Sequence, residues 1–493
     1  MAEKSRPRVY TVFYKTPMTL FYGVPDTGEW VGNLMNRLRG EFPDIEFVGE
    51  ELYNFDAMDP VFKAEEDESI DGILSYDIDL CPSGPRWYNR DESFLAPMRK
   101  KPFIWATPPS VLYPMGYVGM DILNTAMREN LPMISVQSSR FGDVSRGLNL
   151  IKALHHMKES KILAIGCLDN MDLVRMLSQE QDGAWRLDPE ENVERLRERF
   201  GTEIIFMTAK EFKDRYYDAI SEKEAEAEAD RVTKEAINVT GPTREEIVNH
   251  ARWIPATRNA VRDLDVDGVM VYELLTELSA GIAKPCMAMC ELKDEGIPMA
   301  AMGCLDSMVT QLLMGYVTGR AGFTNDTLID TSRGAALACY CCGPRRWEGP
   351  DSTPVPYEIR HCCAGGSTYA NDVHEHQGKL FTSVRIGIEG DLIVTHQGKL
   401  AGRIHREVSP AEWGDWKEEV IPNWKQPVSF SEEQMGCQNR YVIETDAETA
   451  WKNFVKYWDR AGHHRTLYLG DWRKEIRDLA TFTGLPLVEE DRD

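Results

Sequence analysis

Short apolar runs alternate with helix-like segments through the first third of the chain. The strand-like runs cover residues 9–13, 45–48, 72–76, 102–106 and 133–136. Between the first two runs, Trp30, Leu34 and Leu38 recur at every fourth position, which places them on one face of a helix. Buried strands that alternate with helices are typical of a parallel sheet with crossover helices. This pattern predicts a Rossmann-like, flavodoxin-like domain over residues 1–157.

The alternation begins again after this domain and later changes character. Three further strand-like runs cover residues 162–165, 203–207 and 268–271. They predict a second Rossmann-like domain over residues 158–320. Further on, strand-type alternation interrupted by glycines, as in 380–388, is typical of antiparallel strands. We therefore expect an α/β protein in which two parallel-sheet domains precede a β-rich, barrel-like domain over residues 321–493.

Charge and hydropathy narrow the range of partners. The 493 residues carry a formal net charge of -24, and binding to a nucleic-acid backbone depends on basic patches. No 18-residue apolar stretch occurs, and the charged N-terminus does not resemble a signal peptide. We expect a cytoplasmic protein that binds neither nucleic acid nor a membrane.

The eleven cysteines concentrate in one part of the chain. Eight of them lie between Cys286 and Cys363. A long chain without a secretion signal favours reduced thiols, and free cysteines are usually buried in a core. A zinc cluster is the alternative, and its members would be Cys339, Cys341, Cys342, His361, Cys362 and Cys363.

Ligand-capable side chains gather around a helical run at residues 308–316. Asp306 and Asp326 are expected beyond the two ends of this run, which spans roughly 15 Å. The two carboxylates can converge only if the chain folds back, and Gly319 and Gly322 permit such a return.

Histidines supply further candidate ligands. His463 and His464 open a strand-like run, and adjacent residues of a regular strand point to opposite faces, so one of them is the candidate. His374 and His376 would share one face of a strand and could be metal ligands, but an exposed polar loop is the favoured interpretation.

These segments resemble the L-fucose isomerase and L-arabinose isomerase superfamily of metal-dependent aldose–ketose isomerases. Residues 292–298 (LKDEGIP) resemble the family's L-N-D-x-G-I-P loop, and residues 317–319 (VTG) resemble its L-T-G segment. Asp326 lies seven residues after Gly319, as the family's aspartate does, and His464 resembles its near-terminal histidine. Cys304-Leu305-Asp306 occupies the place of the family's E-x-D motif.

The resemblance implies a metal site in which Asp306, Asp326 and His464 are the ligands and the two aspartates transfer protons. It implies Mn²⁺, with Mg²⁺, Zn²⁺ and Fe²⁺ as other candidates, and an enediol intermediate formed from a small sugar. The family also implies a homo-oligomer, either a trimer or a hexamer.

The chain departs from the family pattern at the position of the ligand glutamate, which is Cys304. Three interpretations remain open: Asp306 has taken over the ligand role, Cys304 is a thiolate ligand that favours Zn²⁺ or Fe²⁺, or the site is altered. Tyr340 replaces a histidine of the family's A-H-C-x-x-P segment. Further candidates for metal or substrate contacts are His361, Glu375, His376 and His463.

The expected function is therefore divalent-metal-dependent isomerisation of an aldose, a ketose or a modified sugar. A metal-dependent lyase or epimerase acting on a sugar derivative is the first alternative. A sugar-binding protein without catalytic activity is the second.

Overall fold

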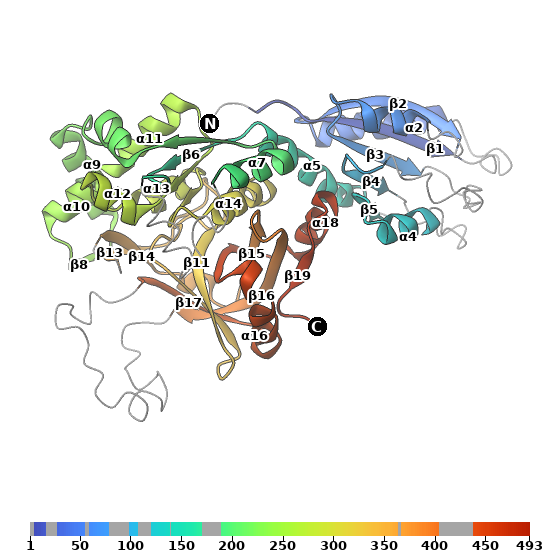
Figure 1. The fold of residues 1–493 in the computed structure, drawn as a ribbon. Coiled ribbons are helices and arrows are strands. Elements are labelled where there is room, and N and C mark those ends of the chain that lie inside the picture. The colour runs from blue at the N-terminus through green and yellow to red at the C-terminus, as the bar shows by residue number, and fades with distance from the viewer. Residues whose placement is uncertain are drawn as a thin grey trace. The chain divides into compact units, whose positions relative to one another are not determined.

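The computed structural model describes residues 4–15, 27–54, 59–77, 98–106, 120–138, 140–169, 189–362, 366–403 and 437–493. These residues form two compact units, and many of their elements are labelled in Figure 1. The first unit comprises residues 3–158 and 474–486, and the second comprises residues 159–473 and 487–493.

A five-stranded parallel sheet forms the centre of the first unit. Its strands follow the order β2-β1-β3-β4-β5. Their bounds are β1 Arg8–Lys15, β2 Glu46–Asn54, β3 Gly72–Asp77, β4 Phe103–Ala106 and β5 Met133–Val136. The helices are α2 Thr27–Glu41, α3 Asp59–Glu66, α4 Met120–Arg128, α5 Ser145–Lys158 and α18 Arg473–Thr483. All five strands predicted for this part of the chain are present.

The buried face of α2 differs from the predicted one. Val31, Met35 and Leu38 are buried, whereas Trp30 and Leu34 are only partly buried. A strict spacing of four drifts around a helix of 3.6 residues per turn, and the 31, 35, 38 series follows the turn more closely. The apolar face is therefore rotated by about one residue from the prediction.

A four-stranded parallel sheet lies in the second unit, in the order β10-β9-β6-β7. Its strands are β6 Lys161–Ile165, β7 Glu203–Met207, β9 Gly268–Val271 and β10 Met299–Ala300. The α-helices of this region are α7 Pro189–Phe200, α8 Ala209–Phe212, α9 Glu222–Glu235, α10 Arg244–Ala251, α11 Trp253–Leu264, α12 Glu273–Ala280, α13 Cys286–Asp294 and α14 Leu305–Thr318.

The same unit contains a β-rich region. A seven-stranded sheet has the order β15-β18-β11-β12-β17-β16-β19, and β15 also pairs with β16, so six of the strands form a closed ring of pairings. The strands are β11 Phe323–Asp330, β12 Ala335–Tyr340, β15 Leu380–Gly387, β16 Leu392–Arg403, β17 Asn439–Glu444, β18 His464–Leu469 and β19 Leu487–Glu489. A small sheet consists of β8 Asn238–Thr240, β13 Tyr357–His361 and β14 Ser367–Asn371. Helices α16 Ala447–Lys456 and α17 Trp458–Ala461 precede β18.

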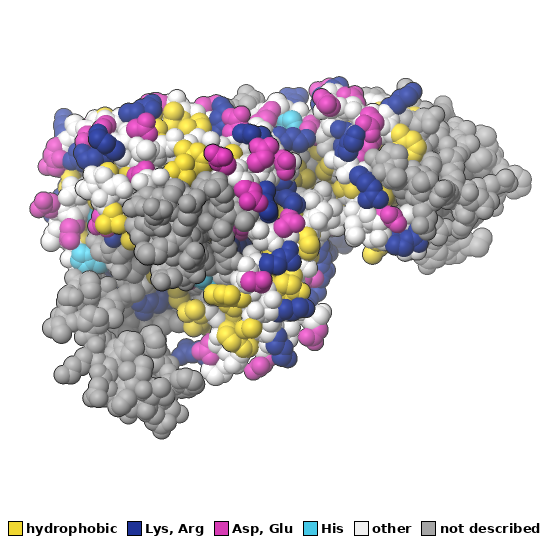
Figure 2. All heavy atoms as spheres, viewed as in Figure 1, with side chains coloured by type: hydrophobic (Ala, Val, Ile, Leu, Met, Phe, Trp, Pro, Cys, Tyr) yellow, Lys and Arg dark blue, Asp and Glu magenta, His cyan; other side chains and the backbone are white. Residues whose placement is uncertain are grey.

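The structure is thus of mixed α/β class, with parallel sheets and a β-rich region as predicted. The nine described cysteines form no disulfide bonds. Among the described residues, no helix is both long and apolar enough to cross a membrane. Figure 2 shows acidic side chains interspersed with basic ones over the visible face. The predicted three-domain division stays a prediction.

A buried ionic network ties the end of the chain to the β-rich sheet. The Glu490 carboxylate pairs with Arg465 of β18, with Nη2 2.6 Å from Oε1, and with His396 of β16, with Nδ1 3.0 Å from Oε2. Glu490 is 1% exposed. Burial alone would raise the pKa of Glu490, but Arg465 and His396 lower it from 4.5 to about 2. The carboxylate therefore remains ionised inside the protein.

We predict that Glu490→Gln lowers the free energy of unfolding at neutral pH by roughly 3–5 kcal/mol, because it leaves the Arg465 charge buried without its partner. A lowered pKa contributes stability that is present above pH 4.5 and is lost as the pH falls toward about 2. Urea unfolding followed by circular dichroism from neutral to acid pH measures both effects. Glu444→Gln, at an exposed position of β17, is the matched control, and an equal loss in both variants would contradict the prediction.

Candidate metal centre

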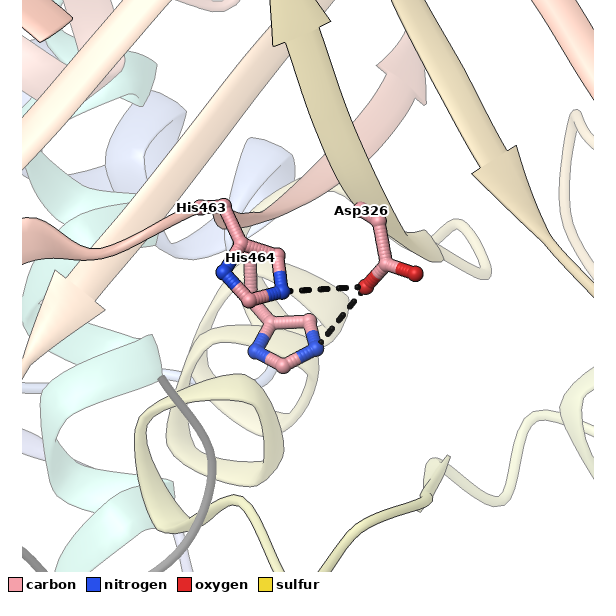
Figure 3. A group of neighbouring side chains, drawn as sticks. All are labelled: Asp326, His463 and His464. Carbon is pink, nitrogen blue, oxygen red and sulfur yellow. Dashed lines mark ion pairs between the residues drawn. The ribbon is translucent and has the colours of Figure 1, made fainter. Parts of the chain in front are cut away.

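Asp326 and two histidines meet where β11 and β18 pair. In the antiparallel register Asp326 lies opposite His464, and His463 immediately precedes β18. Asp326 Oδ1 is 3.0 Å from His464 Nε2 and 3.4 Å from His463 Nε2 (Figure 3). The two imidazoles thus converge on one carboxylate oxygen.

Both histidines reach the same site because only one of them belongs to the strand. Opposite orientation was expected for adjacent residues of a regular strand, but β18 begins at His464. Gly462, in a backbone conformation with φ 52°, precedes His463 and turns the chain into the strand. His463 is therefore outside the pleat, and its ring lies 4.3 Å from the ring of His464.

The three side chains form a charge-coupled group. Burial alone would lower the pKa of His464, but hydrogen bonds to Asp326 and Cys304 raise it to about 10. Burial would raise the pKa of Asp326, yet hydrogen bonds from His463 and His464 hold it well below its usual range. Without a metal, the carboxylate is ionised and His464 is protonated at neutral pH.

The spacing of these atoms suits a metal ion. Ligand atoms placed about 2.1 Å from a metal are separated by about 3.0 Å in octahedral and about 3.4 Å in tetrahedral geometry. The two measured N···O separations are 3.0 and 3.4 Å, and the three ligand atoms all lie within 4.8 Å of one another. A cation could therefore replace the shared protons with little movement of the side chains.

Cys304 approaches the same group from the parallel sheet. The chain leaves β10 through a turn in which Met302 and Gly303 have φ values of 58° and 59°, and α14 begins directly after Cys304. A positive φ is uncommon at a non-glycine residue such as Met302. Cys304 is 2% exposed, accepts a hydrogen bond from Ser307 Oγ at 3.1 Å, and interacts with His464. The residue in the family's glutamate position thus lies beside the histidine of the group.

The β-sheet register adds two residues that were not predicted as members of this centre. Cys339 of β12 lies opposite Asp326, and Arg440 of β17 lies opposite Cys339, so their side chains share one face with Asp326. Burial, opposed in part by Arg440, raises the pKa of Cys339 to about 11. The motif spacing carries no signal for these neighbours, because only strand pairing brings them together.

Asp306 is engaged elsewhere. It lies inside the first turn of α14, not beyond its end as expected, because the helix already begins at Leu305. Asp306 Oδ2 is 2.8 Å from Arg385 Nη2, and Oδ1 accepts a hydrogen bond from Ile388 N at 2.7 Å. A ligand role for Asp306 would require this buried ion pair to break.

The remaining candidates lie apart from the group. Strand alternation turns Tyr340 to the face opposite Cys339, where it packs against apolar cores. His361 lies at the end of β13 in the small sheet, beside Gly241. His376 is buried against Trp347 in a 3-10 turn, and the exposed Glu375 pairs with it at 3.6 Å.

The cysteine-rich stretch forms a thiol cluster in the core. Cys286 Sγ lies 3.7 Å from Cys362 Sγ and also contacts Cys342. Hydrogen bonds to the other two thiols, together with burial, raise the pKa of Cys286 well above its ordinary value. Cys363 is outside the described residues, so the alternative of a zinc cluster that includes it stays open.

The chain matches no protein-family model and none of the curated proteins with which it was compared. The proposed function therefore rests on the geometry of this site and on the sequence motifs.

We predict that Asp326→Asn and His464→Gln each weaken Zn²⁺ or Mn²⁺ binding more than roughly 100-fold, since changes to residues behind the ligands already cost 10- to 100-fold. Binding at pH 8 should release a proton, because the pKa of His464 is about 10 without metal. Calorimetry in two buffers of different ionisation enthalpy measures both quantities. Asp330→Asn on the same strand is the control, and unchanged affinity in the first two variants would contradict the assignment.

We also predict that Asp306→Asn lowers the free energy of unfolding by roughly 3–5 kcal/mol, because it removes the carboxylate charge that pairs with the buried Arg385 guanidinium. The folded variant should still bind one metal per chain. Replacing both partners, as Asp306→Leu with Arg385→Met, should cost less than the single change. Chemical unfolding and metal analysis test this, and a stable variant that no longer binds metal would instead identify Asp306 as a ligand.

Proposed function

We propose that this protein is a divalent-metal-dependent aldose–ketose isomerase that acts on a sugar or a modified sugar through an enediol intermediate. One observation carries the proposal. Cys304, Asp326 and His464 occupy the three positions that resemble the ligand positions of the fucose isomerase family, and they come together from three separate elements.

The strand orders support the finer fold assignment. The order β2-β1-β3-β4-β5 is that of flavodoxin-like sheets, and ligands of such sheets bind beyond the carboxyl ends of the strands. Cys304 follows the carboxyl end of β10 in the second parallel sheet. The closed ring of β-strand pairings supports a barrel-like C-terminal domain. We accordingly propose two Rossmann-like domains and a barrel-like domain, with the metal centre where β11 pairs with β18.

The proposed metal ligands are Asp326, His463 and His464. Two imidazoles and one carboxylate suit Mn²⁺, Fe²⁺ or Zn²⁺ better than Mg²⁺, which prefers oxygen ligands. When bound, the metal would polarise the sugar carbonyl and stabilise the negative charge that develops during enolisation. The 35% exposed side chain of Asp326 and the 23% exposed side chain of His463 leave the centre open to a small substrate.

Proton transfer needs a group beside the metal that is not consumed in holding it. Both ion pairs of Asp326 use Oδ1, so Oδ2 remains directed away from the histidines (Figure 3). Its lowered pKa makes the carboxylate a weak base, which favours a ligand role. Cys304, in the place of the family's glutamate, is the other candidate for moving a proton between C1 and C2.

We further propose that the protein is cytoplasmic and, by resemblance to the family, a trimer or hexamer. A lyase or epimerase would share the enolisation step but not the ketose product. A sugar-binding protein would show neither the enolisation step nor the ketose product.

Incubation of the metal-loaded protein in D₂O with a panel of aldoses, ketoses and their acidic derivatives tests the proposal by NMR. We expect deuterium to enter at C1 or C2 of one sugar, with interconversion of aldose and ketose. Asp326→Asn and Cys304→Ser should each abolish this exchange, whereas Asp330→Asn should retain it.

The outcomes separate the candidate functions. Exchange without ketose formation would favour a lyase or epimerase. Absence of exchange from every sugar, despite confirmed metal binding, would overturn the proposed isomerase.

A further inference from the structure

A cavity of about 260 Å³ lies beside the second half of α14. Its walls are formed mainly by α14, by the loop after α13 and by the segment that leads into β11. Small residues line much of it, and a Cβ added at Gly315 or Gly319 would meet nothing within 4 Å. None of the residues of the candidate metal centre contributes to its lining.

Gln311 brings an unused hydrogen-bonding group to this cavity. It lies on α14, is 2% exposed and lines the cavity wall. Neither its amide nitrogen nor its carbonyl oxygen has a hydrogen-bond partner among the described residues. A buried carboxamide without partners is costly, and such groups in folded proteins call for an explanation. A bound molecule that both donates and accepts a hydrogen bond would supply one.

Two cationic side chains line the same cavity without ion pairs. Lys293 is 3% exposed, and its Nζ donates to the Cys342 carbonyl oxygen at 2.8 Å. Arg320 Nη1 donates to the Leu469 carbonyl oxygen at 2.9 Å. Within the described part of the chain, no carboxylate forms an ion pair with either residue. The acidic residue of the lining, Glu295, is already paired with Arg258 at 2.5 Å.

The excess of positive charge at the cavity wall indicates that the ligand is an anion. Burial lowers the pKa of the Lys293 ammonium, and an anion in the cavity would oppose that effect. The volume is slightly below the roughly 300–1,000 Å³ of pockets for drug-sized molecules, so the ligand is small. We infer that this cavity is a binding site for a small anion that carries a carboxylate or phosphate group, held by Lys293 and Arg320 and oriented by the carboxamide of Gln311.

The site is tested by calorimetric titration of the full-length protein with malonate, inorganic phosphate and glycerol 3-phosphate, at constant ionic strength maintained with chloride. At least one anion should bind saturably at one site per chain. Gln311→Leu and Arg320→Met should each weaken that binding roughly ten-fold or more, as expected for loss of a hydrogen bond to a charged or buried group. Binding of malonate alone would indicate carboxylic acids, and binding of either phosphate compound would indicate phosphate-bearing ligands.

A steric variant makes the test independent of the polar groups. Gly315→Leu places a side chain in the open space beside α14 and should abolish binding while retaining the circular dichroism spectrum of the fold. Gly32→Leu is the matched control, since Gly32 also lies in a helix and a Cβ added there would meet nothing within 4 Å. Lack of saturable binding by all three anions, or binding that the three cavity variants leave unchanged, would overturn the inference.

Discussion

The antiparallel pairing of β11 with β18 is the constraint on which the candidate centre depends. It joins segments far apart in the chain, as the 3.2 Å hydrogen bond from Asn325 to the carbonyl oxygen of Arg465, 140 residues later, illustrates. A register shift of one residue would turn every side chain of one strand to the opposite face. Asp326 would then lose His464, and the arrangement that suits a metal ion would disappear although all three residues remained in the sequence.

Buried ion pairs hold the elements on both sides of this pairing. Asp306 connects the first turn of α14 to Arg385 of β15, a neighbour of β18 in the sheet. Glu490 connects the chain end to Arg465 of β18 itself. Because each pair is buried, loss of one partner is far more costly than loss of a partner from an exposed pair. The buried carboxylates of Asp306 and Glu490 thus hold elements around the centre in place. Asp326, in contrast, is a partly exposed carboxylate within the centre itself.

The local apolar pattern predicted every strand of the two parallel sheets except the two-residue β10, because buried parallel strands are continuous apolar runs. The same pattern wrongly placed Asp306 before the start of α14. Cys304, at the N-cap position, makes no side-chain capping hydrogen bond, so no capping residue marks the start of this helix in the sequence. Motif resemblance pointed to Asp326 and His464. His463 reaches Asp326 because β18 begins only at the next residue, His464. Cys339 shares a face with Asp326 because of the register between β11 and β12. Neither relation follows from the spacing of residues along the chain.

The thiol of Cys304 changes which metal ions the proposed centre would favour. A glutamate at this position would add a second hard, anionic oxygen and favour Mn²⁺ or Mg²⁺. A thiol beside the two imidazoles and one carboxylate of the proposed centre is a softer group and shifts the preference toward Zn²⁺ or Fe²⁺. The hydrogen bond between Cys304 and His464 connects the thiol to this histidine, so a metal bound by His464 would change the surroundings of the thiol. In the proposed isomerase, the choice of metal and the role of Cys304 are therefore linked.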